Sequence, residues 1–225
     1  MKKKYLTSLA VGVVLATACP AKLVADVIYD NSKNDLVQRL LAEDGVWFGD
    51  QVVLAGTQRS VSTFSFEYWA ENTTDLSIDL KLHLNDGPLF NGYATPGTVL
   101  FAYDNINPLP NTDRLTIRFD SSDWPGGLDI PANELTLALR FNYSTGTAGV
   151  DIYDPPVVGS SYDDYWLMTP SGWQLSVNNN FPKVNIAMEI QAIPEPTAAA
   201  LGCLGLGVML LLRKRRPSAT FNPGH

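Results

Sequence analysis

Apolar residues recur at every second position in several separate runs between residues 26 and 192. The clearest run covers residues 76–84, where Leu and Ile alternate with polar residues. Such a period of two places one face of a β-strand in a core and the other in solvent. The pattern therefore predicts strands in this segment. Further runs lie at 64–68, 115–119, 135–141 and 184–190, with shorter apolar stretches at 52–54 and 98–103.

Turn signals rich in Gly, Pro, Asn and Asp separate these runs, for example at 85–88, 95–97 and 124–127. Many strands joined by such turns, without long helical segments between them, are typical of an all-β domain. We predict an antiparallel two-sheet β-sandwich that is jelly-roll-like. Residues 35–43 are the one stretch of this segment for which the sequence suggests a short helix.

The amino-terminal end differs from this pattern. Three lysines at residues 2–4 precede an apolar stretch at residues 6–18, which has the length of a signal-peptide core and is too short to span a membrane. We predict a secretory signal peptide with cleavage after Ala25. Cleavage after Ala18 or Ala21 is the alternative, because Leu23 is large for its place before the cut.

The carboxyl-terminal end carries three elements in a fixed order. The tripeptide Pro194, Glu195 and Pro196 comes first, and proline restricts it to an extended conformation. An apolar run at 197–212 follows, which forms a transmembrane helix of about 24 Å if it is helical throughout. Basic residues then favour retention of the end in the cytoplasm. These residues are Arg213, Lys214, Arg215 and Arg216.

This order of elements resembles the PEP-CTERM sorting signal, which is also labelled the ice-binding protein C-terminal domain. The resemblance implies export from a Gram-negative bacterium, with cleavage at residues 194–196 by an exosortase, a membrane transpeptidase-like enzyme. It implies a destination at the cell surface or in an exopolysaccharide-rich biofilm matrix. Residues 48–57 and 153–161 also look like parts of the central domain of such proteins. That second resemblance implies an architecture and no activity.

The expected organisation has four parts. The alternatives for the tail are a permanent membrane anchor that is never cleaved and a Pro-Glu-Pro segment that is only a linker. The expected partners are the Sec translocon, signal peptidase, the exosortase and exopolysaccharide. The parts are a signal peptide at 1–25, a β-sandwich domain at 26–192, a sorting and anchor segment at 193–216 and a cytoplasmic extension at 217–225.

Charge and cysteine content narrow the function of the domain. The chain has a net charge of -7, but residues 26–192 hold eight Lys and Arg against 22 Asp and Glu, a balance of about -14. Such a charge repels nucleic acid, which we exclude as a partner. The two cysteines, Cys19 and Cys203, lie outside the domain, so disulfide and thiol chemistry are absent from it. Acylation of Cys19, as in a lipoprotein, is an alternative reading of that residue.

Two groups of side chains could bind a ligand. Four aspartates flank a loop rich in Pro, Gly and Ser, and a hard cation such as Ca²⁺ prefers several carboxylate and carbonyl oxygens. The alternative is that they are solvated loop acids. These residues are Asp151, Asp154, Asp163 and Asp164.

Aromatic residues in the same region could stack on sugar rings, although aromatic residues of a small β-domain are more often core residues. The candidates are Tyr162, Tyr165, Trp166 and Trp173, with Trp124 in another loop. A Ca²⁺-assisted carbohydrate-binding module is therefore an alternative function of the domain.

Catalysis has little support. His83 is the one histidine of residues 26–192 and falls on the polar side of its run, and no hydrolase, zinc or phosphate-binding motif occurs. A polysaccharide-degrading enzyme needs only two carboxylates and is the distant alternative. We expect a non-enzymatic exported protein without an obligatory cofactor.

Overall fold

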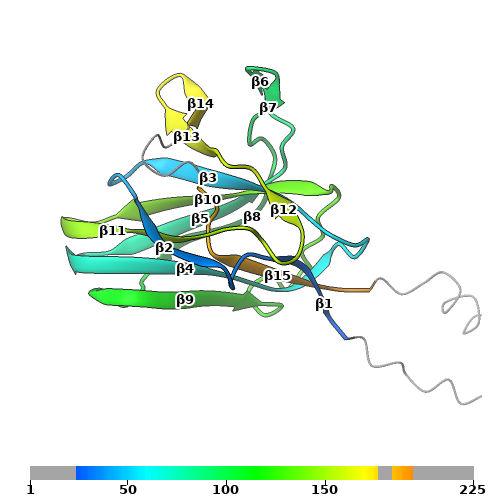
Figure 1. Ribbon diagram of the computed structural model, residues 1–225, viewed down its shortest axis with the longest axis horizontal. Coiled ribbons are helices and arrows are strands. Elements are labelled where there is room, and N and C mark those ends of the chain that lie inside the picture. The colour runs from blue at the N-terminus through cyan, green and yellow to red at the C-terminus, as the bar shows by residue number, and fades with distance from the viewer. Residues whose placement is uncertain (1–23, 177–183, 195–225) are drawn as a thin grey trace, which may run out of the picture.

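The structure is a computed structural model that describes residues 24–176 and 184–194. Over these residues the chain is all-β, with two large antiparallel sheets that form a sandwich (Figure 1). This confirms the predicted fold class at that level. None of the described residues belongs to a helix that could cross a bilayer. The predicted tail from Glu195 onward and most of the signal peptide lie outside the described residues.

The first sheet is built around its longest strand, β4. Strand β9 pairs with one edge of β4, while β15 and then β11 share the other edge. Strands β1 and β2 complete the sheet by pairing with β15 and β11. The strands are β1 (Asp26–Asp30), β2 (Asp35–Leu41), β4 (Ser60–Thr74), β9 (Thr112–Asp120), β11 (Thr145–Tyr153) and β15 (Met188–Ile193).

The second sheet has the order β14-β13-β3-β10-β5-β8, and β12 also pairs with β3. Two hairpins, β6-β7 and β13-β14, project from the same side of the sandwich (Figure 1). The strands outside the first sheet are β3 (Trp47–Val53), β5 (Ser77–His83), β6 (Leu89–Phe90), β7 (Tyr93–Ala94), β8 (Val99–Ile106), β10 (Glu134–Asn142), β12 (Ser160–Ser161), β13 (Tyr165–Thr169) and β14 (Gly172–Ser176).

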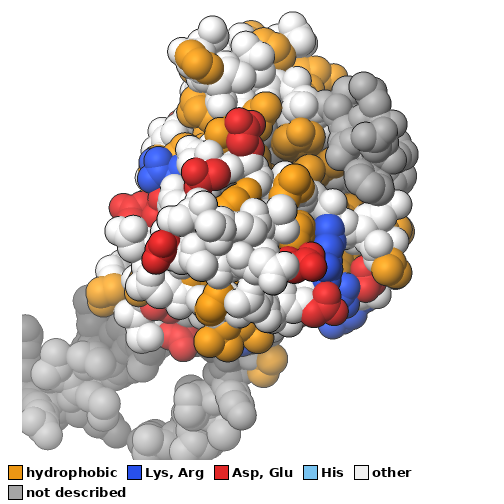
Figure 2. Space-filling view, turned by 90° about the vertical axis from the view of Figure 1, so that its left-hand side faces the viewer, with side chains coloured by type: hydrophobic (Ala, Val, Ile, Leu, Met, Phe, Trp, Pro, Cys, Tyr) orange, Lys and Arg blue, Asp and Glu red, His pale blue; other side chains and the backbone are white. Residues whose placement is uncertain are grey.

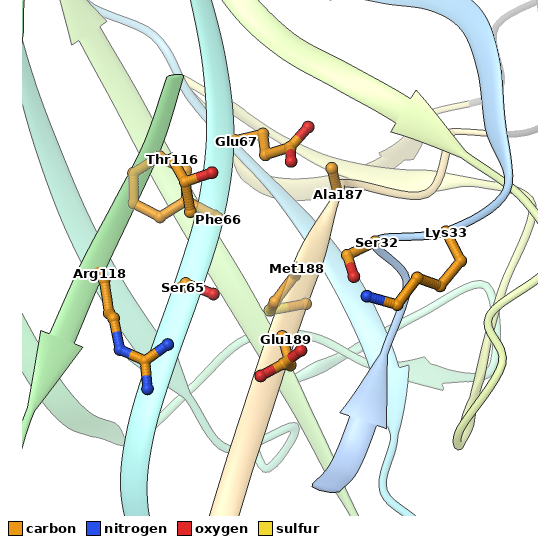
Figure 3. Close-up of a pocket in the computed structure, with 10 residues that line it drawn as sticks. All are labelled: Ser32, Lys33, Ser65, Phe66, Glu67, Thr116, Arg118, Ala187, Met188 and Glu189. Atoms are coloured by element: carbon orange, nitrogen blue, oxygen red, sulfur yellow. The ribbon is translucent and has the colours of Figure 1, made fainter. Parts of the chain in front are cut away.

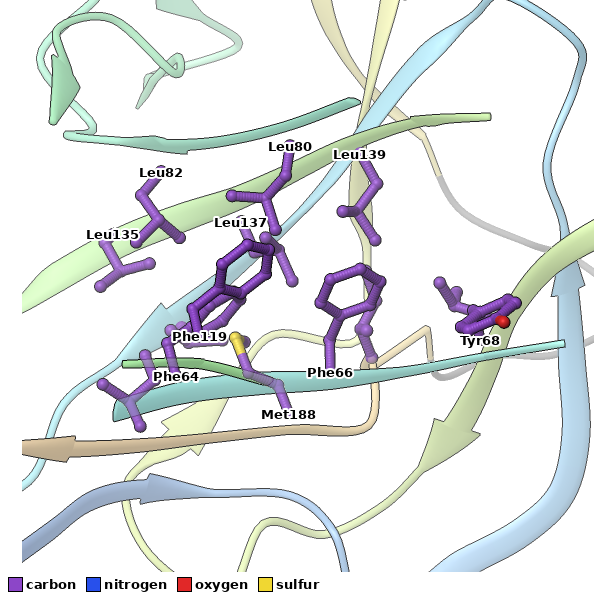
Figure 4. Packing of buried hydrophobic residues seen from close by; sticks show 14 of the residues in the cluster. Phe64, Phe66, Tyr68, Leu80, Leu82, Phe119, Leu135, Leu137, Leu139 and Met188 are labelled. Atoms are coloured by element: carbon purple, nitrogen blue, oxygen red, sulfur yellow. The ribbon is translucent and has the colours of Figure 1, made fainter. Parts of the chain in front are cut away.

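The core lies between the sheets and is formed by the apolar positions of the alternating runs. Figure 4 shows Phe64 and Phe66 of β4 opposite Leu80 of β5 and Leu137 of β10. All four side chains are buried. Burial of each large apolar side chain contributes roughly 1.5–3 kcal/mol relative to exposure, so the period-two pattern fixes which face of each strand turns inward.

The predicted helix at residues 35–43 is wrong, because Asp35–Leu41 forms strand β2. Arg39 pairs with Asp151 of β11, and the ladder shifts in register near Val37, which has a φ of 56°. An isolated helix of this length is marginal in water, whereas a strand here completes hydrogen bonds of β11. Tertiary pairing therefore outweighs the local tendency.

A buried carboxyl group joins the two stretches that suggested a related central domain. Asp50, in residues 48–57, accepts hydrogen bonds from Ile186 N at 2.7 Å and from Ser161 Oγ, in residues 153–161, at 3.0 Å. Burial holds the pKa of Asp50 well above the usual range of a carboxyl. The hydrogen bond between Asp50 and Ser161 links β3 to β12 inside the sandwich, so it serves the architecture of the domain.

Candidate functional site

Cross-strand pairing sets the outer side chains of the first sheet in rows. Ser65 of β4 is paired with Arg118 of β9 on one side and with Glu189 of β15 on the other. Directly paired residues share a face of the sheet, and the serine is much shorter than its neighbours. A cavity of about 250 Å³ therefore lies above the short serine in the middle of the row. Figure 3 shows Arg118 and Lys33 on opposite sides of the residues that line it.

A second cavity of about 250 Å³ lies further along the same strand and is lined by Trp69. The residues Ser65, Glu67 and Trp69 follow one another at every second position of β4, so both hollows lie on one face. We call the two hollows together the β4 trough. The two hollows follow one another along β4 as separate cavities that share no lining residue.

Trp69 is only 7% exposed, and the guanidinium of Arg39 lies 5.2 Å from its ring centre. Its Nε1 is buried and has no hydrogen-bond partner among the described residues. Buried donors are nearly always paired in native proteins, and an unpaired one costs about 1–3 kcal/mol. Trp69 therefore carries an unsatisfied donor beside the second hollow.

Arg114 lies between the two hollows and contacts three carboxylates. Its Nη2 is 2.7 Å from Asp35 Oδ2, and its Nε is 3.6 Å from Glu67 Oε2 and 3.7 Å from Asp151 Oδ2. Burial opposes ionisation of Asp35, but hydrogen bonds from the backbone N–H of Val37 and from Arg114 outweigh it and lower the pKa of Asp35. On the end of the sandwich seen in Figure 2, basic side chains lie directly beside acidic ones.

The four predicted Ca²⁺ ligands lie in different environments. Asp151 is 1% exposed on the outer face of the first sheet, where Arg39 Nε donates to its Oδ1 at 3.2 Å. Its position on strand β11 pairs with Arg39, so guanidinium groups contact it, and its role as a Ca²⁺ ligand stays a prediction. Asp154 accepts a hydrogen bond from Asn185 at 2.8 Å, and Asp163 contacts the neighbouring Val184 through its backbone carbonyl.

Within residues 24–176 and 184–194, no group of three or more His, Cys, Asp or Glu side chains is arranged to hold a metal ion. Burial raises the pKa of Asp164. Calcium binding by Asp154, Asp163 and Asp164 stays a prediction.

The predicted sugar-stacking residues also occupy different environments in the structure. Trp166 is 1% exposed on the outer face of the second sheet, so neighbouring residues cover its ring, and stacking on a sugar by this residue stays a prediction. Its Nε1 donates to Gln51 Oε1 at 3.2 Å, and Gln51 Nε2 donates to Glu134 Oε2 at 2.9 Å. Tyr162, which is partly exposed, donates to the other oxygen of Glu134 at 3.4 Å. This chain of hydrogen bonds is completed within the protein.

Tyr165 packs against the core from β13, and Trp173 meets His83 edge to face with ring centres 6.0 Å apart. His83 is therefore covered and 6% exposed, although its run predicted a solvated face. Trp124 is also a core residue. Tyr93 of β7, in one of the two projecting hairpins, is 54% exposed.

Of the sorting tripeptide, Pro194 is the first residue after β15, while Glu195 and Pro196 lie outside the described residues, as does the basic cluster at 213–216. The sequence did not indicate the trough residues Arg118, Glu189 and Trp69, because they come from three strands far apart in the chain. Their one signal is a polar or outward position in an alternating run.

Comparison of the chain with protein-family models, with curated proteins and with solved structures finds no match in any of the three. The function therefore has to be argued from the residues and their geometry. The two features that bear on it are the β4 trough and the position of the chain ends relative to the fold.

Proposed function

We propose that this chain is an exported, non-enzymatic protein of the cell surface or extracellular matrix, sorted and processed through its PEP-CTERM-like tail. The observation that carries the proposal is the pairing of the first strand with the last. Asp26 of β1 is the register partner of Ala192 of β15, so the predicted signal peptide and the predicted tail leave the domain side by side. Figure 1 shows both ends at one corner of the sandwich.

This arrangement suits a precursor held in a membrane at both ends. Two membrane segments that leave a folded domain at one corner allow it to fold on the outer side while both are still inserted. Cleavage after Ala25 and cleavage at residues 194–196 would each leave the paired strands whole, because β1 begins at Asp26 and β15 ends at Ile193. Removal of both segments therefore costs the domain none of its ladder hydrogen bonds.

The finer parts of the proposal rest on the sequence. These are the transmembrane helix at 197–212, the cytoplasmic position of the basic cluster, the action of an exosortase, the association with exopolysaccharide in a Gram-negative host and the jelly-roll-like connectivity. Calcium-assisted sugar binding is the alternative role for the domain.

Mass spectrometry of the protein isolated from its host tests the proposal. We expect a product that begins at Asp26 and ends within residues 193–196. Replacing Pro194 and Pro196 by Ala should leave residues 197–216 attached and the protein in the membrane fraction. The chain offers a matched control in Pro108 and Pro110, which form another Pro-x-Pro in a loop. A wild-type product that retains residues 197–216 would overturn the proposal.

A further inference from the structure

We infer that the β4 trough binds a strand of acidic polysaccharide, with carboxylate groups of the ligand held by Arg118 and Lys33. The inference deepens the proposed matrix role and rests on it for the kind of ligand. The binding itself is a property of the folded domain and can be tested without reference to export.

The first argument is charge. Arg118 and Lys33 flank the first hollow, and neither forms an ion pair with a carboxylate of the described residues. Residues 26–192 have far more acids than bases, so two unpaired cations at one hollow are unexpected there. A guanidinium and an ammonium that line one hollow can each bind an anionic oxygen, and such charge-assisted hydrogen bonds are stronger than those between neutral groups.

The acids of the first hollow are already engaged. Glu67 Oε2 accepts a hydrogen bond from Tyr153 Oη at 2.8 Å and lies beside Arg114, and Glu189 Oε1 accepts one from Gln191 Nε2 at 2.6 Å. These contacts offset part of the repulsion that an anionic ligand would meet. The free lone pairs of the two carboxylates can still accept ligand hydroxyl groups, which a sugar supplies and a simple anion does not.

The second argument is the unpaired donor in the second hollow. Trp69 lines that hollow, and its Nε1 is buried without a hydrogen-bond partner among the described residues. A ligand oxygen there would satisfy it. Because the donor lies on the same face of β4 as Ser65, a ligand that contacts Arg118 and Trp69 together must run along the strand. A polymer chain has that form, whereas a single sugar does not.

The third argument is the floor of the trough. Ser65 and Thr116 present hydroxyl groups for which no hydrogen bond is found among the described residues, and each can donate to a ligand or accept from it. Short hydroxylated side chains between long charged ones leave room for a chain of rings. The wall and the floor therefore match a ligand that carries both carboxylate and hydroxyl groups.

Calorimetry with the full-length chain in detergent micelles tests the inference. The probes are an oligogalacturonate hexamer and a neutral hexamer, cellohexaose. We expect the acidic probe to bind, with affinity that falls as salt rises. Lys33→Ala with Arg118→Ala should weaken binding at least about tenfold, and Trp69→Phe should weaken it severalfold with the ring preserved. Arg118→Lys should retain more affinity than Arg118→Ala.

Lys81→Ala is the matched control, because it removes a positive charge from the outer face of the second sheet, where the ammonium lies over Trp47. It should leave binding unchanged, and circular dichroism should show every variant folded. Equal binding of the double variant and the wild type would overturn the inference, as would failure of the wild type to bind the acidic probe or a preference for cellohexaose. None of these results bears on tail processing, which mass spectrometry reads separately.

Discussion

The two outer faces of the sandwich both carry a buried tryptophan beside acidic side chains, but the two indole N–H groups differ in their hydrogen bonding. On the second sheet, Trp166 donates to Gln51 and the chain of contacts continues through Glu134 to Tyr162. On the first sheet, Trp69 is buried with a free Nε1. The difference concerns the two tryptophans, since His83 Nε2 on the second face is also buried without a partner among the described residues. A satisfied indole such as that of Trp166 gains less from a ligand than the unpaired one of Trp69.

The comparison also shows why aromatic content alone is a weak guide to sugar binding. The sequence offers the tryptophans of β13 and β14 as the richer cluster, yet the structure covers Trp166 and sets Trp173 against His83. Aromatic side chains bury much apolar area, so a fold tends to use them for packing first. Unpaired polar groups are the better signal here.

The largest expected difference in stability between the two faces comes from substitution of their tryptophans. Trp166→Ala should lower the free energy of unfolding by about 3–5 kcal/mol, because it removes a fully buried indole and leaves a cavity. Trp69→Phe should cost less than about 1.5 kcal/mol, because the ring stays and no hydrogen bond of the described protein is lost. Urea unfolding followed by far-ultraviolet circular dichroism measures both. Equal losses would contradict this ranking of the two tryptophans.

A second, smaller effect concerns the charges. Arg39→Gln should lower the free energy of unfolding by about 1–3 kcal/mol, because the buried Asp151 loses its hydrogen-bonded cation. Lys81→Gln on the other face should cost at most about 1 kcal/mol, since it removes only a cation over the Trp47 ring. Thermal unfolding of the two variants gives the comparison. A larger loss of unfolding free energy for Lys81→Gln than for Arg39→Gln would contradict the prediction that the charge on the first face contributes more to stability.

The sequence predicted those features of the fold that depend on the local pattern within one strand. The alternation at 76–84 and 135–141 gave the strands β5 and β10 and their inward faces, because a period of two is a local property of the chain. Strand β2 was missed because its sequence lacks that period, and its pairing with β11 joins residues more than 100 positions apart. The β4 trough also could not be predicted from the sequence. Its row of Arg118, Ser65 and Glu189 can be recognised only when the register of three strands is known.

The smallest expected effect is a pH dependence of the unfolding free energy, caused by His83 on the second face. Burial lowers the pKa of His83, the charge of Lys81 acts in the same direction, and the hydrogen bond with Gly97 O and the charge of Asp86 oppose them. Between this lowered pKa and the usual value of 6.5, the unfolded chain binds more protons than the folded one. Stability is therefore lost as the pH falls through that window, and none of it is lost above.

His83→Gln should remove this loss, so the difference in unfolding free energy between variant and wild type should change in favour of the variant from pH 7 to pH 5. Buried carboxyl groups with raised pKa, such as Asp50, are present in both proteins and cancel in the difference. On the first face the pKa of Asp35 is lowered, so the stability that it contributes persists until the pH falls below 3.8. A difference that stays constant from pH 7 to pH 5 would mean that His83 takes up its proton in the folded state as readily as in the unfolded one, and the cover over the second face would then be open to water.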